Sequence, residues 1–332
     1  MGVALVRALR RGILVTLALL VLAIALAAWF APYAYFECKY WLHGPEPAVV
    51  PQPAEPVAGR WVDDYFVVEQ IDPTTMAIGE PRYYQGNYSY LIIGSERAIL
   101  FDAGTGTRDI VPVVRSLTSL PVTVIPSHLH FDHVGALGRF RTALLDDPTL
   151  RARIRDSQLT LQRYEFLGFS QGLASPTFRV DEWWQADSTI DLGNRQVRVL
   201  STPGHTPTSV SLYDAQRQQL FVGDFVYPGH LYAFLPGASR SAYLATTQRL
   251  IAQIHPATRI YTAHMAEPPA PGHAPVLELA DLEALEATLV AIEQGKLDSV
   301  APGGLDSLGG FPRVFPVRGV MKFATGFSWN NR

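Results

Sequence analysis

The 332-residue chain is poor in cysteine and in net charge, and both scarcities exclude classes of protein. Its single cysteine, Cys38, cannot form an internal disulfide and cannot anchor a cysteine-rich zinc site. The formal net charge of −3 comes with no basic stripe, so the sequence predicts no nucleic-acid partner. Because an exported protein can also lack disulfides, the cysteine count leaves the cellular compartment open.

Charge is absent from residues 12–31, an apolar run of roughly 30 Å as a helix, which matches the hydrocarbon core of a bilayer. Arginines precede it in residues 1–11, so the positive-inside rule predicts a basic, cytoplasmic N-terminus. We therefore predict a single transmembrane anchor over residues 12–31, with the catalytic domain on the extracytoplasmic side, periplasmic or extracellular. The alternative is a signal peptide, whose cleavage would release a secreted domain.

The remaining chain divides by composition into three parts. Proline recurs through residues 43–59, which predicts an extended linker. Short β-rich runs and helical patterns follow over residues 60–295, and two strand-rich halves of this kind predict two sheets packed face to face with helices outside. Residues 296–332 are predicted to form an extended C-terminal tail on the domain. The sequence does not indicate an oligomeric state.

The densest chemistry is the run SHLHFDHVG at residues 127–135, directly after a predicted strand. Imidazole and carboxylate groups together are ligands for zinc, and iron and manganese accept them as well. Burying such groups without a ligand would leave several polar atoms without partners. The run therefore predicts a metal site, whose candidate ligands are His128, His130, Asp132 and His133.

Three further candidate ligands each follow a short predicted strand. They are His205 in TPGHTP, Asp224 in VGDF and His264 in YTAH. The order His-x-His-x-Asp-His, Gly-His, Gly-Asp and a strand-end His resembles the metal signature of the metallo-β-lactamase superfamily. The resemblance covers roughly residues 64–294, and the FDAGTG turn at residues 101–106 is also similar to a turn of that family.

The resemblance implies a fold and an assignment of ligands. The fold is of the α/β class, an αββα sandwich of two β-sheets flanked by helices. Asp102, in the FDAGTG turn, would brace the metal loops from behind. Seven ligands are too many for one tetrahedral zinc but suit two ions that keep an open position for water. The first zinc would be bound by His128, His130 and His205, the second by Asp132, His133 and His264, with Asp224 bridging the two.

A pair of dications lowers the pKa of a bridging water, and the resulting hydroxide attacks an ester-type bond. Asp132 and Asp224 are the expected catalytic carboxylates, because they neutralise metal charge and orient the attacking group. The pattern is most similar to glyoxalase II-like thioesterases and lactonases, which implies a small acyl substrate joined by a thioester, lactone or carboxylic ester bond. Aromatic loops favour an apolar substrate. The pocket candidates are Tyr84, Tyr227, His230 and Tyr232.

Other functions stay open at this point. An enzyme similar to the persulfide dioxygenases would use a single iron, and metal analysis would separate it from a dinuclear hydrolase. A β-lactamase is disfavoured because many true β-lactamases use a cysteine ligand, whereas Cys38 lies outside the domain. A non-catalytic binding protein of the same fold would usually have lost ligands, and none is missing here.

Overall fold

The computed structural model of the protein describes residues 13–23, short stretches between 30 and 51, and residues 58–265, 273–299 and 313–325. Two large sheets form its centre. The first has eight strands in the order β1 (Arg60–Trp61), β2 (Val67–Asp72), β3 (Thr75–Glu80), β4 (Asn87–Ile93), β5 (Ala98–Phe101), β6 (Val122–Ile125), β7 (Arg141–Leu145) and β10 (Glu182–Trp184). The second has six, in the order β11 (Thr189–Asp191), β12 (Gln196–Ser201), β13 (Val210–Asp214), β14 (Gln219–Phe221), β16 (Arg259–Tyr261) and β17 (Val276–Leu277).

Smaller elements surround these sheets. A three-stranded sheet has the order β15 (His230–Ala233), β19 (Met321–Thr325) and β18 (Arg313–Arg318), and β8 (Gln158–Thr160) pairs with β9 (Thr177–Arg179). The described helices within residues 60–295 are α2 (Val111–Leu117), α3 (Pro148–Arg151), α4 (Arg163–Phe166), α5 (Arg240–Gln253) and α6 (Leu279–Glu293), with short 3-10 turns η1 (Phe131–His133) and η2 (Gly168–Gln171).

The two large sheets pack face to face because alternate side chains of a strand point to opposite sides. Tyr90 of β4 and Phe101 of β5 contact Phe221 of β14 across the interface, with ring centroids 5.2 and 6.4 Å apart. Leu91 and Leu100, next to them in sequence, belong to a separate apolar cluster on the other face of the first sheet. One strand therefore supplies both the central core and an outer layer.

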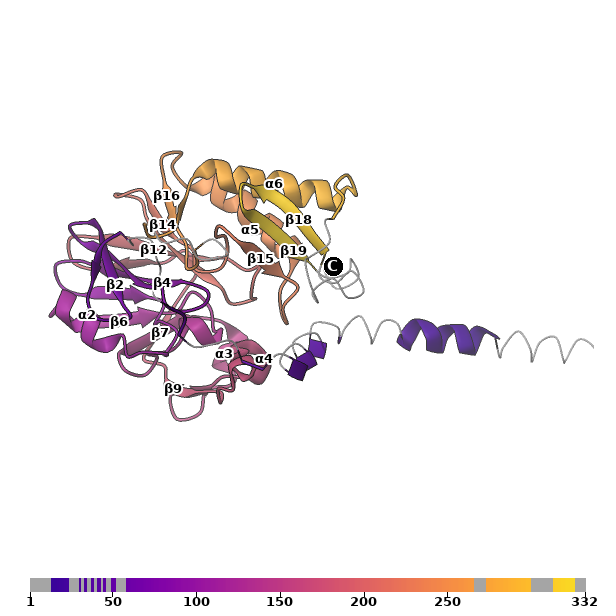
Figure 1. Ribbon diagram of the computed structural model, residues 1–332, viewed down its shortest axis with the longest axis horizontal. Coiled ribbons are helices and arrows are strands. Elements are labelled where there is room, and N and C mark those ends of the chain that lie inside the picture. The colour runs from indigo at the N-terminus through magenta and orange to yellow at the C-terminus, as the bar shows by residue number, and fades with distance from the viewer. Residues whose placement is uncertain are drawn as a thin grey trace, which may run out of the picture.

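Helices cover both outer faces. Val113 and Val114 of α2 pack on the first sheet, while Leu250 of α5 and Leu285 of α6 pack on the second. Figure 1 shows the resulting layers, with α5 and α6 on one side of the two sheets and α2 on the other. The predicted αββα sandwich is confirmed.

The prediction of a transmembrane helix over residues 12–31 is wrong. Within the described residues, no helix is long and apolar enough to cross a bilayer. This finding also overturns the predicted membrane localisation with an extracytoplasmic domain. The predicted cytoplasmic segment, residues 1–11, and most of the linker at residues 43–59 lie outside the described residues.

The C-terminal region, predicted as an extended tail, contains paired strands. The hairpin of β18 and β19 adds to β15, with Leu231 opposite Phe323 in a parallel pairing. Phe323 packs against Tyr243 of α5 at a ring-centroid distance of 5.2 Å, so the hairpin shares the apolar layer of the helices. Pro316 lies in β18, a sheet-edge strand, where a missing backbone donor is tolerated.

A buried arginine joins the two large sheets away from the ligand loops. Arg195, between β11 and β12, is 1% exposed, and its guanidinium lies 2.6 Å from the carboxylate of Asp214 in the second sheet. It also donates to the Thr74 carbonyl at 2.8 Å and to the Thr75 hydroxyl at 2.9 Å, both at the β2–β3 turn of the first sheet. Removing this side chain would leave the Asp214 carboxylate in a buried site without its main partner.

We expect Arg195→Met to lower the free energy of unfolding by about 3–5 kcal/mol, the usual loss when one partner of a buried ion pair is removed. Urea denaturation of both proteins measures the difference. The control is Arg139→Met, which removes an exposed pair with Asp109 and should change stability by less than about 1 kcal/mol. Equal losses in the two variants would contradict the role given to Arg195.

Candidate metal centre

Four loops bring the predicted ligands to one end of the sandwich, and a fifth carries Asp102. β5 and β6 run parallel, so Asp102 and the loop at residues 126–133 leave the first sheet at the same edge. β14 and β16 are also parallel, and β12 runs in the same direction because it is two antiparallel pairings from β14. Their C-terminal ends therefore share an edge of the second sheet, and all seven predicted ligands lie buried where the two edges meet.

The first group of predicted ligands is a triad of histidines. His130 Nδ1 lies 2.8 Å from His128 Nε2 and 3.1 Å from His205 Nε2. The remaining nitrogen of His205, Nδ1, faces the carbonyl oxygen of Tyr232 at 3.1 Å. Since a carbonyl only accepts, His205 carries its proton on Nδ1 and presents the lone pair of Nε2 to the triad.

The second group contains Asp132, His133 and His264, with ligand atoms within 4.8 Å of one another. The Nε2 atoms of both histidines lie 3.5 Å from Asp132 Oδ2. Asp224 lies between the groups. Its Oδ1 is 3.2 Å from His133 Nε2 and 3.0 Å from His264 Nε2, and its Oδ2 is 3.7 Å from His205 Nε2. One carboxylate therefore spans the two triads.

The two groups differ in electrostatic character. Burial and the neighbouring imidazoles hold the pKa of His128 and of His130 well below the usual range, so both rings are neutral. Burial also opposes charge on His133, but the carboxylates of Asp132, Asp102 and Asp224 outweigh it and raise the pKa of that ring well above its usual value. The first triad is thus rich in neutral nitrogen donors and the second in carboxylate charge.

The donor set fits metal ions. Within the described part of the chain, His133 Nε2 and Asp224 Oδ1 are buried and have no hydrogen-bond partner, although they are 3.2 Å apart. Ring nitrogens of the first triad also lie about 3 Å from one another. A cation between such atoms would satisfy them, as buried polar groups require. Neutral imidazole and carboxylate suit zinc, and the set of donors does not by itself exclude iron or manganese.

A layer of polar groups behind the triads orients them. Asp102 adopts a left-handed φ of 65°, and its Oδ1 accepts from the Ser127 amide at 2.6 Å. Its Oδ2 lies 3.0 Å from His133 Nδ1, so the carboxylate directs His133 Nε2 toward Asp224. Ser127 Oγ lies 3.0 Å from His128 Nδ1 and can orient that ring in the same way. A strained backbone at a buried site is typical of a functional position.

Two glycines allow the loops to approach this closely. A Cβ on Gly223, just before Asp224, would lie 2.2 Å from Ser127 Oγ. A Cβ on Gly135, at the end of the histidine run, would lie 2.1 Å from the Gly106 amide nitrogen. Any side chain at either position would push apart the loops that carry the ligands.

The structure also shows supporting residues that the sequence does not single out. Asn87 donates from Nδ2 to Asp132 Oδ2 and to the Asp132 carbonyl, each at 3.2 Å. Glu80 accepts from the amide and hydroxyl of Thr105 at 2.9 and 2.7 Å, and from the Tyr65 hydroxyl at 2.9 Å. Neither residue stands in a ligand motif, so only their contacts reveal them.

The four pocket candidates divide into two sets. Tyr227, His230 and Tyr232 follow Asp224 and flank both triads: the Tyr227 ring lies 5.1 Å from that of His264, and the Tyr232 carbonyl contacts His205. Tyr84 precedes Asn87, packs against Tyr83 at a ring-centroid distance of 4.7 Å, and lies 3.5 Å from Gln171 at its hydroxyl.

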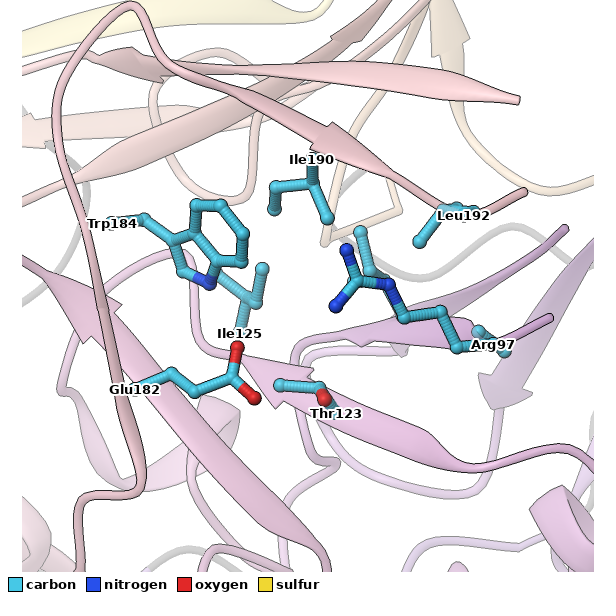
Figure 2. Close-up of a pocket in the computed structure, with 9 residues that line it drawn as sticks. Arg97, Thr123, Ile125, Glu182, Trp184, Ile190 and Leu192 are labelled. Atoms are coloured by element: carbon cyan, nitrogen blue, oxygen red, sulfur yellow. The ribbon is translucent and has the colours of Figure 1, made fainter. Parts of the chain in front are cut away.

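One cavity lies elsewhere. Figure 2 shows it between the sheets, with Trp184, Glu182 and Arg97 around it, and it has a volume of about 10 Å³. None of its lining residues is a predicted ligand. The buried Trp184 Nε1 has no partner among the described residues, and the space suits about one water molecule.

Comparison with known proteins agrees with this fold and site. The chain belongs to the metallo-beta-lactamase superfamily, whose family model matches residues 83–294. It is 29% identical over 209 residues to the acyl-coenzyme A thioesterase MBLAC2 of Gallus gallus, covering 57% of this chain and 76% of the relative. The human MBLAC2 is 31% identical over 200 residues, covering 52% and 71% of the two chains.

More distant similarities extend this result. A hydroxyacylglutathione hydrolase of Synechococcus sp. is 27% identical over 181 residues, covering 54% of this chain and 63% of the relative. A solved metallo-beta-lactamase from Pontibacter korlensis superposes with a TM-score of 0.50 at 19% identity, covering 68% of this chain and 99% of its own. At that identity the structural likeness concerns the fold alone. The chain is therefore a metal-dependent hydrolase of the metallo-beta-lactamase superfamily. The predicted resemblance is confirmed.

We expect Asp102→Asn to weaken metal binding about 10–100-fold, as is common when a group orienting a ligand is changed. An amide that turns its oxygen to the Ser127 N–H presents its NH₂ to His133 Nδ1. That nitrogen must then accept, which moves the proton to Nε2 and removes the lone pair facing Asp224. Zinc titration with a competing chelator measures the affinity, and an unchanged affinity would contradict this role.

A second prediction concerns Glu80, which is 1% exposed. Burial raises its pKa to about 6 despite the hydrogen bonds from Thr105 and Tyr65. Because the pKa of Glu80 in the folded protein lies above the ordinary glutamate value of 4.5, its contribution to stability is fully present below pH 4.5 and is lost as pH rises through 6. The stability difference between wild type and Glu80→Gln should therefore change by about 2 kcal/mol across this window.

Urea unfolding at several pH values between 4 and 7 measures this difference. Glu96→Gln, at an exposed position, serves as the control and should show no such pH-dependent difference from wild type. Parallel pH profiles for wild type and Glu80→Gln would be inconsistent with a raised pKa at Glu80.

Proposed function

We propose that the protein is a dinuclear metal-dependent hydrolase of thioesters, with His128, His130 and His205 binding one ion and Asp132, His133 and His264 the other. The observation that carries this proposal is the Asp224 carboxylate, whose two oxygens reach toward both triads. Among ester-type bonds, the thioester is favoured by the relatives at 29 and 31% identity that are named acyl-coenzyme A thioesterases. Lactones and carboxylic esters are the related substrates to compare.

Zinc or another divalent cation held by these ligands would supply Lewis-acid polarisation of the scissile carbonyl and a water molecule of lowered pKa. The protein's own groups do the rest. Asp224 would accept a hydrogen bond from the attacking water. Asp132, held by Asn87 and by His264, adds a second negative charge that lowers the repulsion between two cations. Asp102 and the Tyr232 carbonyl keep His133 and His205 in the tautomers that bind metal.

The substrate class is tested by comparing rates of the zinc-loaded protein on thioesters, lactones, aryl esters, phosphodiesters and a β-lactam. We expect the highest kcat/KM for thioesters, because a thiolate leaves without protonation. Preference for a phosphodiester or the β-lactam would refute the proposed substrate class. A single tightly bound iron after full metal loading would indicate the dioxygenase-like alternative.

We expect Asp224→Asn to lower kcat by about 100-fold or more, as for the loss of a key electrostatic group, and to lose metal from the pair. Asparagine keeps the size of the side chain but not the charge that holds two cations together. Metal analysis of the purified variant and its rate on the best thioester provide the two measurements. Asp64→Asn, at an exposed position, should retain both metal and activity. An Asp224→Asn protein with two ions and normal turnover would disprove the bridged site.

A further inference from the structure

The small sheet of β15, β19 and β18 forms one side of the metal centre. The Tyr227 hydroxyl donates to the His230 carbonyl, and the Tyr227 ring lies beside His264 of the second triad. Two residues further on, the Tyr232 carbonyl accepts from His205 of the first triad. The backbone of β15 thus contacts both sides of the site. Its first residue, His230, contacts Tyr227 beside the second triad, and Tyr232 contacts the first triad.

The two faces of this sheet have different surroundings. Leu231 and Phe323 point toward α5 and α6 and belong to their apolar cluster. The opposite face has Tyr232, Ala324 and Val314 in one row, packed near Phe234 and η2. Figure 1 shows the sheet beneath α5 and α6, at the end of the sandwich.

The next row on this opposite face is basic. His230 and Lys322 are paired across β15 and β19, so their side chains share that face, about 7 Å along the strands from the row of Tyr232. Both residues are half-buried. The His230 ring lies 6.5 Å from that of Tyr232. In the part of the chain that the structure describes, neither His230 nor the Lys322 ammonium pairs with a carboxylate.

A lysine ammonium that pairs with no carboxylate is available to an anion, and hydrogen bonds from a charged donor are stronger than those between neutral groups. No carboxylate among the described residues pairs with His230 or Lys322. A substrate of the proposed reaction would bind at the neighbouring metal centre. We infer that His230 and Lys322 form an anion-binding subsite that holds a phosphate or carboxylate group of the thioester substrate. This inference rests on the proposed thioesterase function and adds the substrate's charge to it.

The geometry assigns the two halves of the substrate. The reacting carbonyl must lie between the triads, next to Asp224. The anionic group then lies at the His230–Lys322 row. The neighbouring row of Tyr232, Ala324 and Val314 carries no positive charge. Two kinds of thiol carry a suitable anion: coenzyme A has phosphates, and glutathione has carboxylates.

The test uses the zinc-loaded full chain and three thioesters with the same butyryl group: butyryl-coenzyme A, S-butyrylglutathione and the uncharged S-butyryl-N-acetylcysteamine. We expect Lys322→Met to raise KM about tenfold for the thioester whose anion the subsite holds, the effect of losing one charge-assisted hydrogen bond. KM for the uncharged thioester should change less than about twofold, because this interaction is absent from it. The affected substrate identifies phosphate or carboxylate as the preferred anion.

Matched variants separate charge from structure. Lys322→Arg keeps the charge and should retain most of the affinity for the charged thioester. Lys296→Met removes an exposed lysine just beyond α6 and should leave every KM unchanged. Equal effects of Lys322→Met on charged and uncharged thioesters would overturn the subsite. An unaltered KM for both charged thioesters would overturn it as well.

A binding measurement keeps the two proposals distinguishable. Desulfo-coenzyme A and S-methylglutathione carry the same anions without a reacting bond, and calorimetry gives their Kd for wild type and Lys322→Met. A roughly tenfold weaker Kd in the variant for one of them would support the subsite even if no thioester is hydrolysed, in which case only the proposed reaction fails. Unchanged Kd values for both probes, with hydrolysis intact, would refute the subsite alone.

Discussion

Five imidazole rings and two carboxylates lie buried against one another at the end of the sandwich, and such a cluster is stable only if its lone pairs and charges are satisfied. Much of the local structure follows from this requirement. Asp102 accepts a left-handed backbone to reach both Ser127 and His133. Gly223 and Gly135 omit side chains where loops from different strands must meet.

The same requirement explains why both sheets contribute side chains to the cluster. Strand directions place the C-terminal ends of β5 and β6 opposite those of β12, β14 and β16, so each sheet supplies part of each triad or its supports. Arg195 and the aromatic contacts around Phe221 hold the sheets together away from the ligand loops. A small shift of one sheet over the other would separate His205 and His264 from the histidines of the first sheet.

The C-terminal hairpin also supports the cluster, although it lies beyond the part of the chain that the family model covers. β18 and β19 follow the matched range, residues 83–294, and complete a sheet with β15. That strand holds the carbonyl that sets the tautomer of His205. Without the hairpin, β15 would have unpaired backbone groups along both of its edges. The hairpin therefore stabilises a wall of the metal centre, and the same pairing places Lys322 beside it.

The sequence alone predicted the two packed sheets and named the seven side chains that the structure brings together, because short motifs at strand ends are local patterns and the sandwich follows from alternating apolar runs. It misled at the N-terminus, where an apolar composition predicted a spanning helix that the described residues do not contain. Only the tertiary structure decided the position of Asn87, Glu80 and the β18–β19 hairpin. Their roles depend on partners far away in sequence, such as Asp132 for Asn87 and β15 for β19. A local pattern cannot carry that information, since a strand or a hydrogen bond formed across the fold is stabilised by its distant partner.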